Sequence, residues 1–122
     1  MTAMRHLFMV LPLLAIASCA SAGTAEEFQW SVECPKTVDK GSEFTFTVHA
    51  VRPGGPEVAG VTYRYQILWT AGSGSPLRHK GSSAALERVH ARMVPGPATM
   101  VVTCENKQGL DVKVAETTFE VK

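Results

Sequence analysis

The feature that most limits how this chain can fold is an alternation of apolar and other residues with a period of two. From Val61 to Trp69, every second residue is aromatic or β-branched. Residues two apart lie on the same face of a β-strand, so this segment is expected to form a strand with one buried face. Comparable alternations occur at 28–34, 44–50, 89–93, 100–104 and 110–114. The chain is therefore expected to be all-β.

Segments rich in proline and glycine, notably 53–56 and 95–97, separate these alternations, and no segment has the spacing of an amphipathic helix. Six or seven short strands, about 10 to 15 residues apart, are typical of an antiparallel sandwich or a small barrel. The 122 residues leave room for one such domain, expected at 28–122. The inward-facing residues change phase between Val114 and Phe119, which predicts a β-bulge.

The N-terminal segment predicts export. Residues 7–17 form an eleven-residue apolar run that follows Arg5. A bilayer span needs about 20 apolar residues, so this run is too short to cross a membrane. A short apolar run behind a basic residue is typical of a secretory signal peptide.

The end of this run, Ile16-Ala17-Ser18-Cys19, resembles the lipobox of bacterial lipoproteins. The resemblance implies a signal peptide of residues 1–18, lipidation of Cys19 and a tether of residues 19–27. Ala20 stands where an inner-membrane retention signal has Asp, which implies the outer membrane if the source is Gram-negative. The alternative is ordinary cleavage after Ala22, which would give a soluble periplasmic or secreted protein.

The predicted strands resemble those of bacterial extracellular immunoglobulin-like domains. The residues that carry the resemblance are 41–50, 63–69 and the strand at 100–104 before a predicted hairpin. The resemblance covers 28–122 and implies an antiparallel immunoglobulin-like β-sandwich of six to seven strands. Antibody-type domains differ from this chain in two respects: Cys34 lies on the first predicted strand instead of the second, and Val102 replaces a tyrosine two residues before the second cysteine.

The three cysteines predict one disulfide. Lipidation of Cys19 would leave Cys34 and Cys104, both in the inward phase of their predicted strands. Exported proteins enter an oxidising compartment where disulfides persist. A Cys34–Cys104 disulfide is therefore expected.

Composition and motifs exclude several functions. Twelve basic residues against eleven acidic ones give a net charge of +1, whereas nucleic-acid binding needs a strong basic excess. No nucleophile, zinc, phosphate-loop or dinucleotide motif is present, so no catalytic residue and no cofactor is expected. Glu87 and His90 have a metal-ligand spacing that brings both to one face only on a helix, so no metal is expected. The aromatic residues Trp30, Tyr63, Tyr65 and Trp69 are interpreted as core, with a ligand-binding aromatic face as the alternative.

Positive charge is concentrated in one part of the chain. Residues 63–94 contain five basic residues and one acidic residue. The alternation at 89–93 places Arg88, His90 and Arg92 on one strand face. We interpret these charges either as protection of a sheet edge or as a surface for an anionic partner. The candidate surface residues are Arg78, Lys80, Arg88, His90 and Arg92.

These patterns together predict an exported, membrane-tethered, non-enzymatic binding or structural module of the bacterial cell envelope. Its expected partners are the membrane, through the lipid anchor, and an envelope protein, a polysaccharide or another anionic partner such as lipid head groups. No nucleic-acid partner is expected. The alternative is a small envelope inhibitor of a protease or lysozyme.

Overall fold

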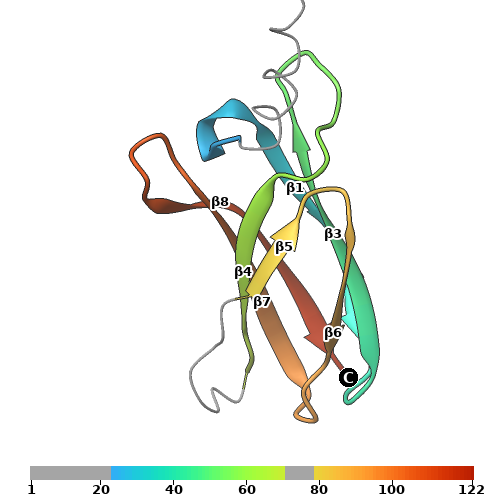
Figure 1. The fold of residues 1–122 in the computed structure, drawn as a ribbon. Coiled ribbons are helices and arrows are strands. Elements are labelled where there is room, and N and C mark those ends of the chain that lie inside the picture. The colour runs from blue at the N-terminus through green and yellow to red at the C-terminus, as the bar shows by residue number, and fades with distance from the viewer. Residues whose placement is uncertain (1–22, 71–78) are drawn as a thin grey trace, which may run out of the picture.

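Eight strands in two sheets make up the part of the chain that the structure, a computed structural model, describes: residues 23–70 and 79–122 (Figure 1). One sheet has three strands, in the order β1 (Gln29–Glu33), β3 (Glu43–Val51) and β6 (Leu86–His90). The other sheet has five strands, in the order β2 (Thr37–Val38), β8 (Asp111–Val121), β7 (Gly96–Glu105), β4 (Thr62–Leu68) and β5 (His79–Ser82). A 3₁₀ turn, η2 (Ala25–Glu27), precedes β1. In these two ranges, no helix has the length and apolar character needed to span a membrane.

The two sheets confirm the all-β sandwich, with two differences from the predicted architecture. The residues that the structure describes form eight strands, whereas six to seven were predicted. The five-stranded sheet is mixed, because β2 pairs in parallel with the end of β8. A strand of two residues, Thr37 and Val38, is too short for an alternation to reveal it.

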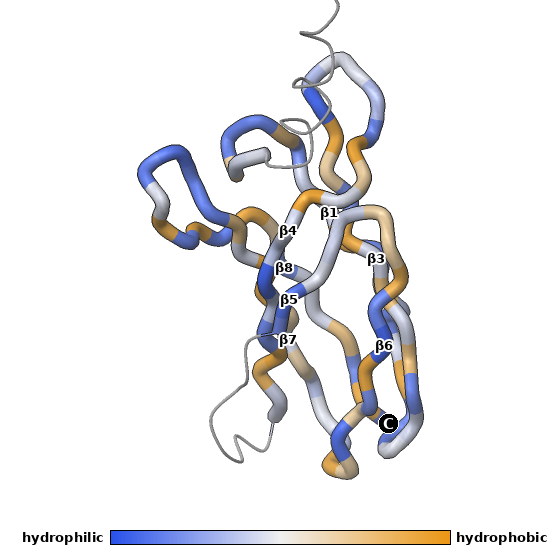
Figure 2. The backbone as a smooth tube through the Cα atoms, viewed as in Figure 1, coloured by the Kyte–Doolittle hydropathy of each residue, from blue (hydrophilic) through white to orange (hydrophobic). Residues whose placement is uncertain are grey.

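The core lies between the sheets, where the predicted alternation places it. Val48 on β3 belongs to the same core cluster as Met100 and Val102 on β7, and all three residues are 0% exposed. Figure 2 shows the same alternation along β6, where hydrophilic and hydrophobic positions follow one another. Burying one face of each strand in this way is the main stabilising contribution that the sequence pattern predicts.

The predicted β-bulge is present on β8. Val102 of β7 pairs with Ala115, but the next residue, Thr103, pairs with Lys113, so Val114 is left without a partner in the ladder. The extra residue shifts the inward-facing set from Val114 to Ala115. The phase change predicted between Val114 and Phe119 is therefore confirmed.

The end of the predicted tether, residues 23–27, packs on the sandwich instead of extending from it. Ala25 is 6% exposed, and its carbonyl accepts a hydrogen bond from Trp30 Nε1 at 3.0 Å. Thr24 and Glu27 form a capping box, and Arg52 approaches Glu27 at 3.5 Å. The polar composition of this segment suggested a tether, but the Thr-x-x-Glu spacing is a helix-start signal. The signal peptide, Cys19 and the rest of the tether lie outside the described residues.

The disulfide predicted between Cys34 and Cys104 is absent, and both residues are free thiols. Cys34 lies beside Phe46, whereas Cys104 belongs to a smaller core cluster that contains Ala50. Phe46 and Ala50 are four residues apart on β3, or about 13 Å at 3.3 Å per residue, whereas a disulfide needs Cα atoms about 4.4 to 6.8 Å apart. Alternation identifies the face on which a side chain lies, but not its level along the sandwich. Burial raises the pKa of the half-buried Cys34 thiol to about 11, which disfavours the reactive thiolate.

Candidate functional site

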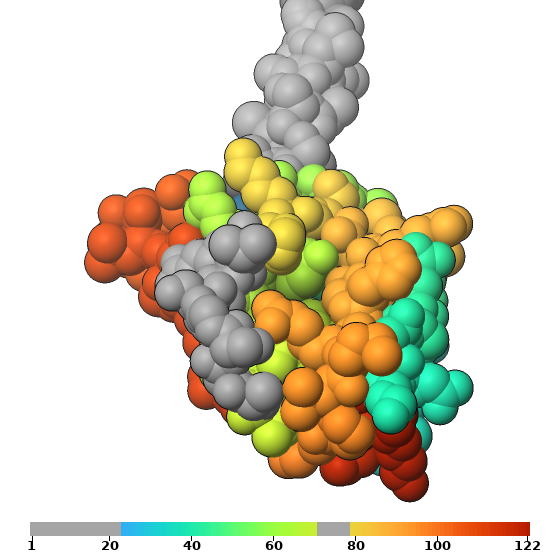
Figure 3. Space-filling view, turned by 90° about the horizontal axis from the view of Figure 1, so that it is seen from below, coloured from blue at the N-terminus to red at the C-terminus, as the bar shows by residue number. Residues whose placement is uncertain are grey.

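The sandwich has a cleft along one side, between the last strands of its two sheets. β5 ends the five-stranded sheet, β6 ends the three-stranded sheet, and a short turn joins them (Figure 1). The opening has a volume of about 490 Å³. Figure 3 shows it from below, with residues of β4 visible in green between yellow β5 and orange β6. The residues that line it are Tyr65, Ile67, Trp69, His79, Lys80, Glu87, Arg88, Val89, His90 and Arg92.

The turn that closes one end of the cleft is fixed by a buried serine. Ser83 is 1% exposed; its hydroxyl donates to the Val58 carbonyl at 2.7 Å and accepts from the Val61 amide at 2.9 Å. The next residue, Ala84, has φ 66°, in the left-handed region. These bonds let the chain leave one sheet at β5 and enter the other at β6, which separates the two strands.

The floor of the cleft is an apolar row on and after β4. Tyr65 and Ile67 are buried, and Trp69 is half-buried, with its ring edge-on to Phe119 at a centroid distance of 5.9 Å. Residues two apart in a strand are about 6.6 to 6.8 Å apart, so these side chains form three regularly spaced contacts. The aromatic residues of the sequence are thus divided: Tyr63 is core at 1% exposed, whereas Tyr65 and Trp69 also line the cleft.

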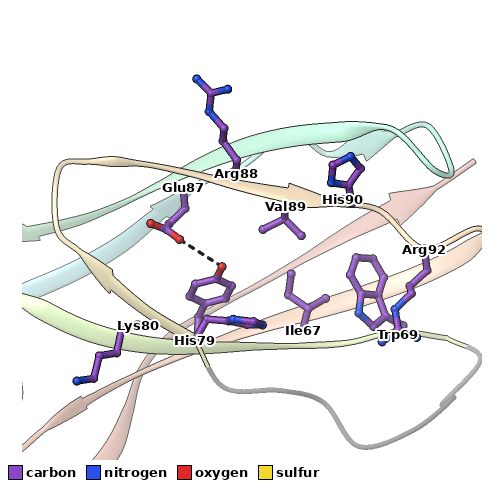
Figure 4. A pocket seen from close by; sticks show the side chains of 10 residues that line it. Ile67, Trp69, His79, Lys80, Glu87, Arg88, Val89, His90 and Arg92 are labelled. Carbon is purple, nitrogen blue, oxygen red and sulfur yellow. Dashed lines mark hydrogen bonds between the residues drawn. The ribbon is translucent and has the colours of Figure 1, made fainter.

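A hydrogen bond crosses the cleft from floor to wall. The Tyr65 hydroxyl donates to Glu87 Oε2 at 3.3 Å (Figure 4). Burial and the nearby Glu87 carboxylate raise the pKa of Tyr65 to about 12, so the phenol remains protonated and a donor at neutral pH. The His79 ring lies against Tyr65 at a centroid distance of 5.3 Å. This end of the cleft therefore has both acceptor and donor groups.

The other end of the cleft has a cation over an aromatic ring. The Arg92 guanidinium lies 5.6 Å from the centroid of the Trp69 ring. A guanidinium at this distance from an indole face is attracted by the ring quadrupole. This contact holds positive charge at the end of the apolar floor.

The structure brings four of the five predicted surface residues to this cleft: Lys80, Arg88, His90 and Arg92. Their side chains do not share one strand face, and the prediction for Arg92 is corrected here. β6 ends at His90, and Ala91 is buried, after which Arg92 packs on Trp69. The fifth residue, Arg78, lies outside the described residues.

The two faces of β6 have different roles. Glu87 and Val89 point toward the floor, whereas Arg88 points away from it (Figure 4). The Arg88 side chain is 72% exposed and lies 4.0 Å from the Glu43 carboxylate. Glu87 and His90 lie on opposite faces, and the described ranges contain no group of three His, Cys, Asp or Glu side chains placed to hold a metal. The residues that line the cleft include three basic ones, Lys80, Arg88 and Arg92, and one acidic one, Glu87.

The sequence analysis missed a charged cluster on the outer face of the three-stranded sheet. His49 lies between two carboxylates, with Nδ1 2.5 Å from Glu57 and Nε2 3.0 Å from Glu33. Hydrogen bonds to these carboxylates raise the pKa of His49. Glu33 and Glu57 are 16 and 8 residues from His49 in sequence, so no local spacing indicated the cluster.

Comparison with known proteins gives one structural similarity. No protein-family model matches the sequence, and no curated protein matches it. Among solved structures, the chain is similar to the CARDB domain of the PF1109 protein from Pyrococcus furiosus, which was solved in complex with di-metal ions. The TM-score is 0.44 at 15% sequence identity, and the match covers 84% of this chain and 96% of that chain.

Proposed function

We propose that the chain is an exported, non-enzymatic binding module of the bacterial cell envelope. A lipid on Cys19 holds it to the membrane, and its sandwich, of immunoglobulin-like type, binds an anionic partner in the cleft between β5 and β6. The observation that carries this proposal is the composition of the cleft lining: Arg92 lies over the apolar floor, Lys80 and Arg88 stand at its edges with their side chains directed outward, and Glu87 is the acidic residue of the lining. Positive charge beside apolar surface attracts and holds an anionic chain.

The position of the anchor favours a partner other than the membrane that holds the protein. Three residues lie between Cys19 and Gly23, where the described structure begins, and the four Cα–Cα steps that join them span at most about 14 Å. Val61 packs in the same cluster as Ala25 at this end of the sandwich. Trp69 lies eight residues farther along the β4 direction, about 26 Å away in an extended strand. The end of the cleft with Trp69 and Arg92 thus lies far from the end of the sandwich where Ala25 packs, which favours a soluble or neighbouring anionic partner over the anchoring membrane.

Two measurements test the proposal. For the anchor, the intact mass of the native protein is expected to show acyl chains on Cys19, and Cys19→Ala is expected to release a soluble form. An unmodified chain that begins at Gly23 would contradict the anchor.

For the cleft, the full-length protein is titrated with polyglutamate and with a linear polyuronate. Arg88→Glu and Arg92→Glu are expected to weaken binding, and Lys107→Glu, in the β7–β8 turn, serves as the charge-matched control. An affinity that does not change with salt concentration or with either arginine substitution would contradict the proposal. Assays against a panel of proteases and lysozymes test the inhibitor alternative with the same preparation.

A further inference from the structure

The three-stranded sheet is one strand too narrow to cover the cleft. β6 is its last strand in the described ranges, while the opposite sheet continues past β7 to β4 and β5. Tyr65 and Ile67 of β4 are buried, with Tyr65 packed on Phe46 of β3 and bonded to Glu87 of β6, and only their edges reach the opening. The apolar surface that the opening offers to a fourth strand is mainly that of the half-buried Trp69 and Val89.

The backbone of β6 presents free groups to this space. The Ala91 amide donates to the Ser42 carbonyl at 2.9 Å, in the same register that pairs Val89 with Phe44. In an antiparallel ladder, alternate residues direct their N–H and C=O groups to the same neighbour. Val89 and Glu87 therefore bond toward β3. The residues whose N–H and C=O groups point to the open edge are Leu86, Arg88 and His90.

We propose that an extended acidic peptide segment of a partner protein binds as a further strand beside β6. The proposal rests on the anionic-partner site proposed above and names its ligand class. Inward-facing side chains of the added strand would contact the half-buried Trp69 and the accessible edges of Tyr65 and Ile67, whose spacing matches every second residue of a strand. Outward-facing side chains would lie beside Arg88 and His90, where carboxylates form favourable cross-strand pairs.

The geometry favours a peptide over the other anionic chains and over a second copy of this protein. A polysaccharide lacks amide groups at strand spacing and cannot pair with three successive edge positions. A second copy pairing β6 with β6 about a two-fold axis would oppose Leu86 to His90 and Arg88 to Arg88. Like charges directly opposite one another destabilise such a pair.

The decisive experiment follows amide hydrogen exchange in the full-length protein in detergent micelles. The probe is a nine-residue peptide of alternating valine and aspartate with blocked ends. At saturation, exchange of the Leu86, Arg88 and His90 amides is expected to slow at least about tenfold, because they gain hydrogen-bond partners. The amides of Glu87 and Val89, already bonded to β3, are expected to exchange as before. Uniform slowing, or none, would overturn the proposal.

Two methylated peptides provide a matched control for backbone pairing. One peptide is N-methylated on the valines and the other on the aspartates. Because alternate residues of a strand direct their amides to the same neighbour, either the valine amides or the aspartate amides face β6. Methylation of the aspartates blocks an antiparallel added strand and methylation of the valines blocks a parallel one, so one peptide is expected to lose about tenfold in affinity while the other binds as before. Equal binding by both would show charge attraction without strand addition.

The remaining comparisons separate failure of this inference from failure of the proposed function. Arg88→Glu is expected to weaken peptide binding about tenfold, and Lys107→Glu to leave it unchanged. Binding of the linear polyuronate but not of the peptide would overturn strand addition and keep the anionic-partner site. Binding of neither would overturn both, and would leave the basic residues as protection of an exposed sheet edge.

Discussion

Substitution of Ser83 by alanine is expected to destabilise the domain far more than its small change in volume suggests. The Ser83 hydroxyl bonds both the Val58 carbonyl and the Val61 amide, and Val61 has no exposed surface. Ser83→Ala removes both bonds and leaves a buried donor and a carbonyl without a partner. The unpaired buried Val61 amide costs about 1 to 3 kcal/mol and the lost bond to the half-buried Val58 carbonyl about 0.5 to 1.5 kcal/mol, so we expect a loss of about 1.5 to 4.5 kcal/mol. This is a large part of the roughly 5 to 15 kcal/mol that stabilises a small domain.

Urea denaturation of Ser83→Ala beside Ser82→Ala measures this effect. Ser82 is the neighbouring residue and is exposed. Ser82→Ala therefore makes the same chemical change as Ser83→Ala but leaves no buried group unpaired. The Ser83→Ala midpoint is expected to fall substantially with an unchanged slope, while Ser82→Ala stays within about 0.5 kcal/mol of the wild type. Equal midpoints for the two variants would refute the reasoning.

Three further substitutions or treatments have expected outcomes. Ala84→Gly is expected to raise the free energy of unfolding by about 0.5 to 1 kcal/mol, because φ 66° is strained for alanine and not for glycine; a lower urea midpoint would contradict this. The His49 cluster has a raised pKa, so its stabilisation is fully present below the unfolded pKa of 6.5 and is lost as pH rises through the folded value. His49→Gln is therefore expected to cost about 0.2 to 1 kcal/mol near pH 5.5 and less near pH 9, measured by denaturation at both pH values. Because Cys34 and Cys104 are free, dithiothreitol is expected to leave the denaturation midpoint unchanged, and alkylation of the unreduced, unfolded protein is expected to label both; a single bridged species would contradict the structure.

Most of the fold follows from alternation because burial decides which face of a strand is apolar. The segments at 44–50, 61–69 and 100–104 alternate cleanly, and each forms a strand with a buried face. Even the bulge at Val114 is visible as a change of phase. β2 was not predictable, because its two residues pair with the distant end of β8.

The site was predictable as a set of charges and not as a cleft. The sequence identified Lys80, Arg88 and His90 because basic residues are concentrated around them. The opening exists because β5 and β6 join different sheets, which depends on pairing with β4 and β3. Alternation also predicted that Arg92 lies on the same strand face as Arg88. In the structure, β6 ends at His90 and Arg92 packs on Trp69. Strand pairing joins residues far apart in sequence, and local patterns do not encode it.

Trp69 provides the most direct test of the claim that the cleft binds an anionic partner. The chain has two tryptophans, so Trp30→Phe leaves Trp69 as the single indole reporter, on the cleft floor and beneath Arg92. Titration of this variant with polyglutamate is expected to change Trp69 emission to saturation, with an affinity that falls as salt rises from about 50 to 200 mM. Emission that stays constant, or a change that is insensitive to salt, would contradict binding of an anionic chain in this cleft.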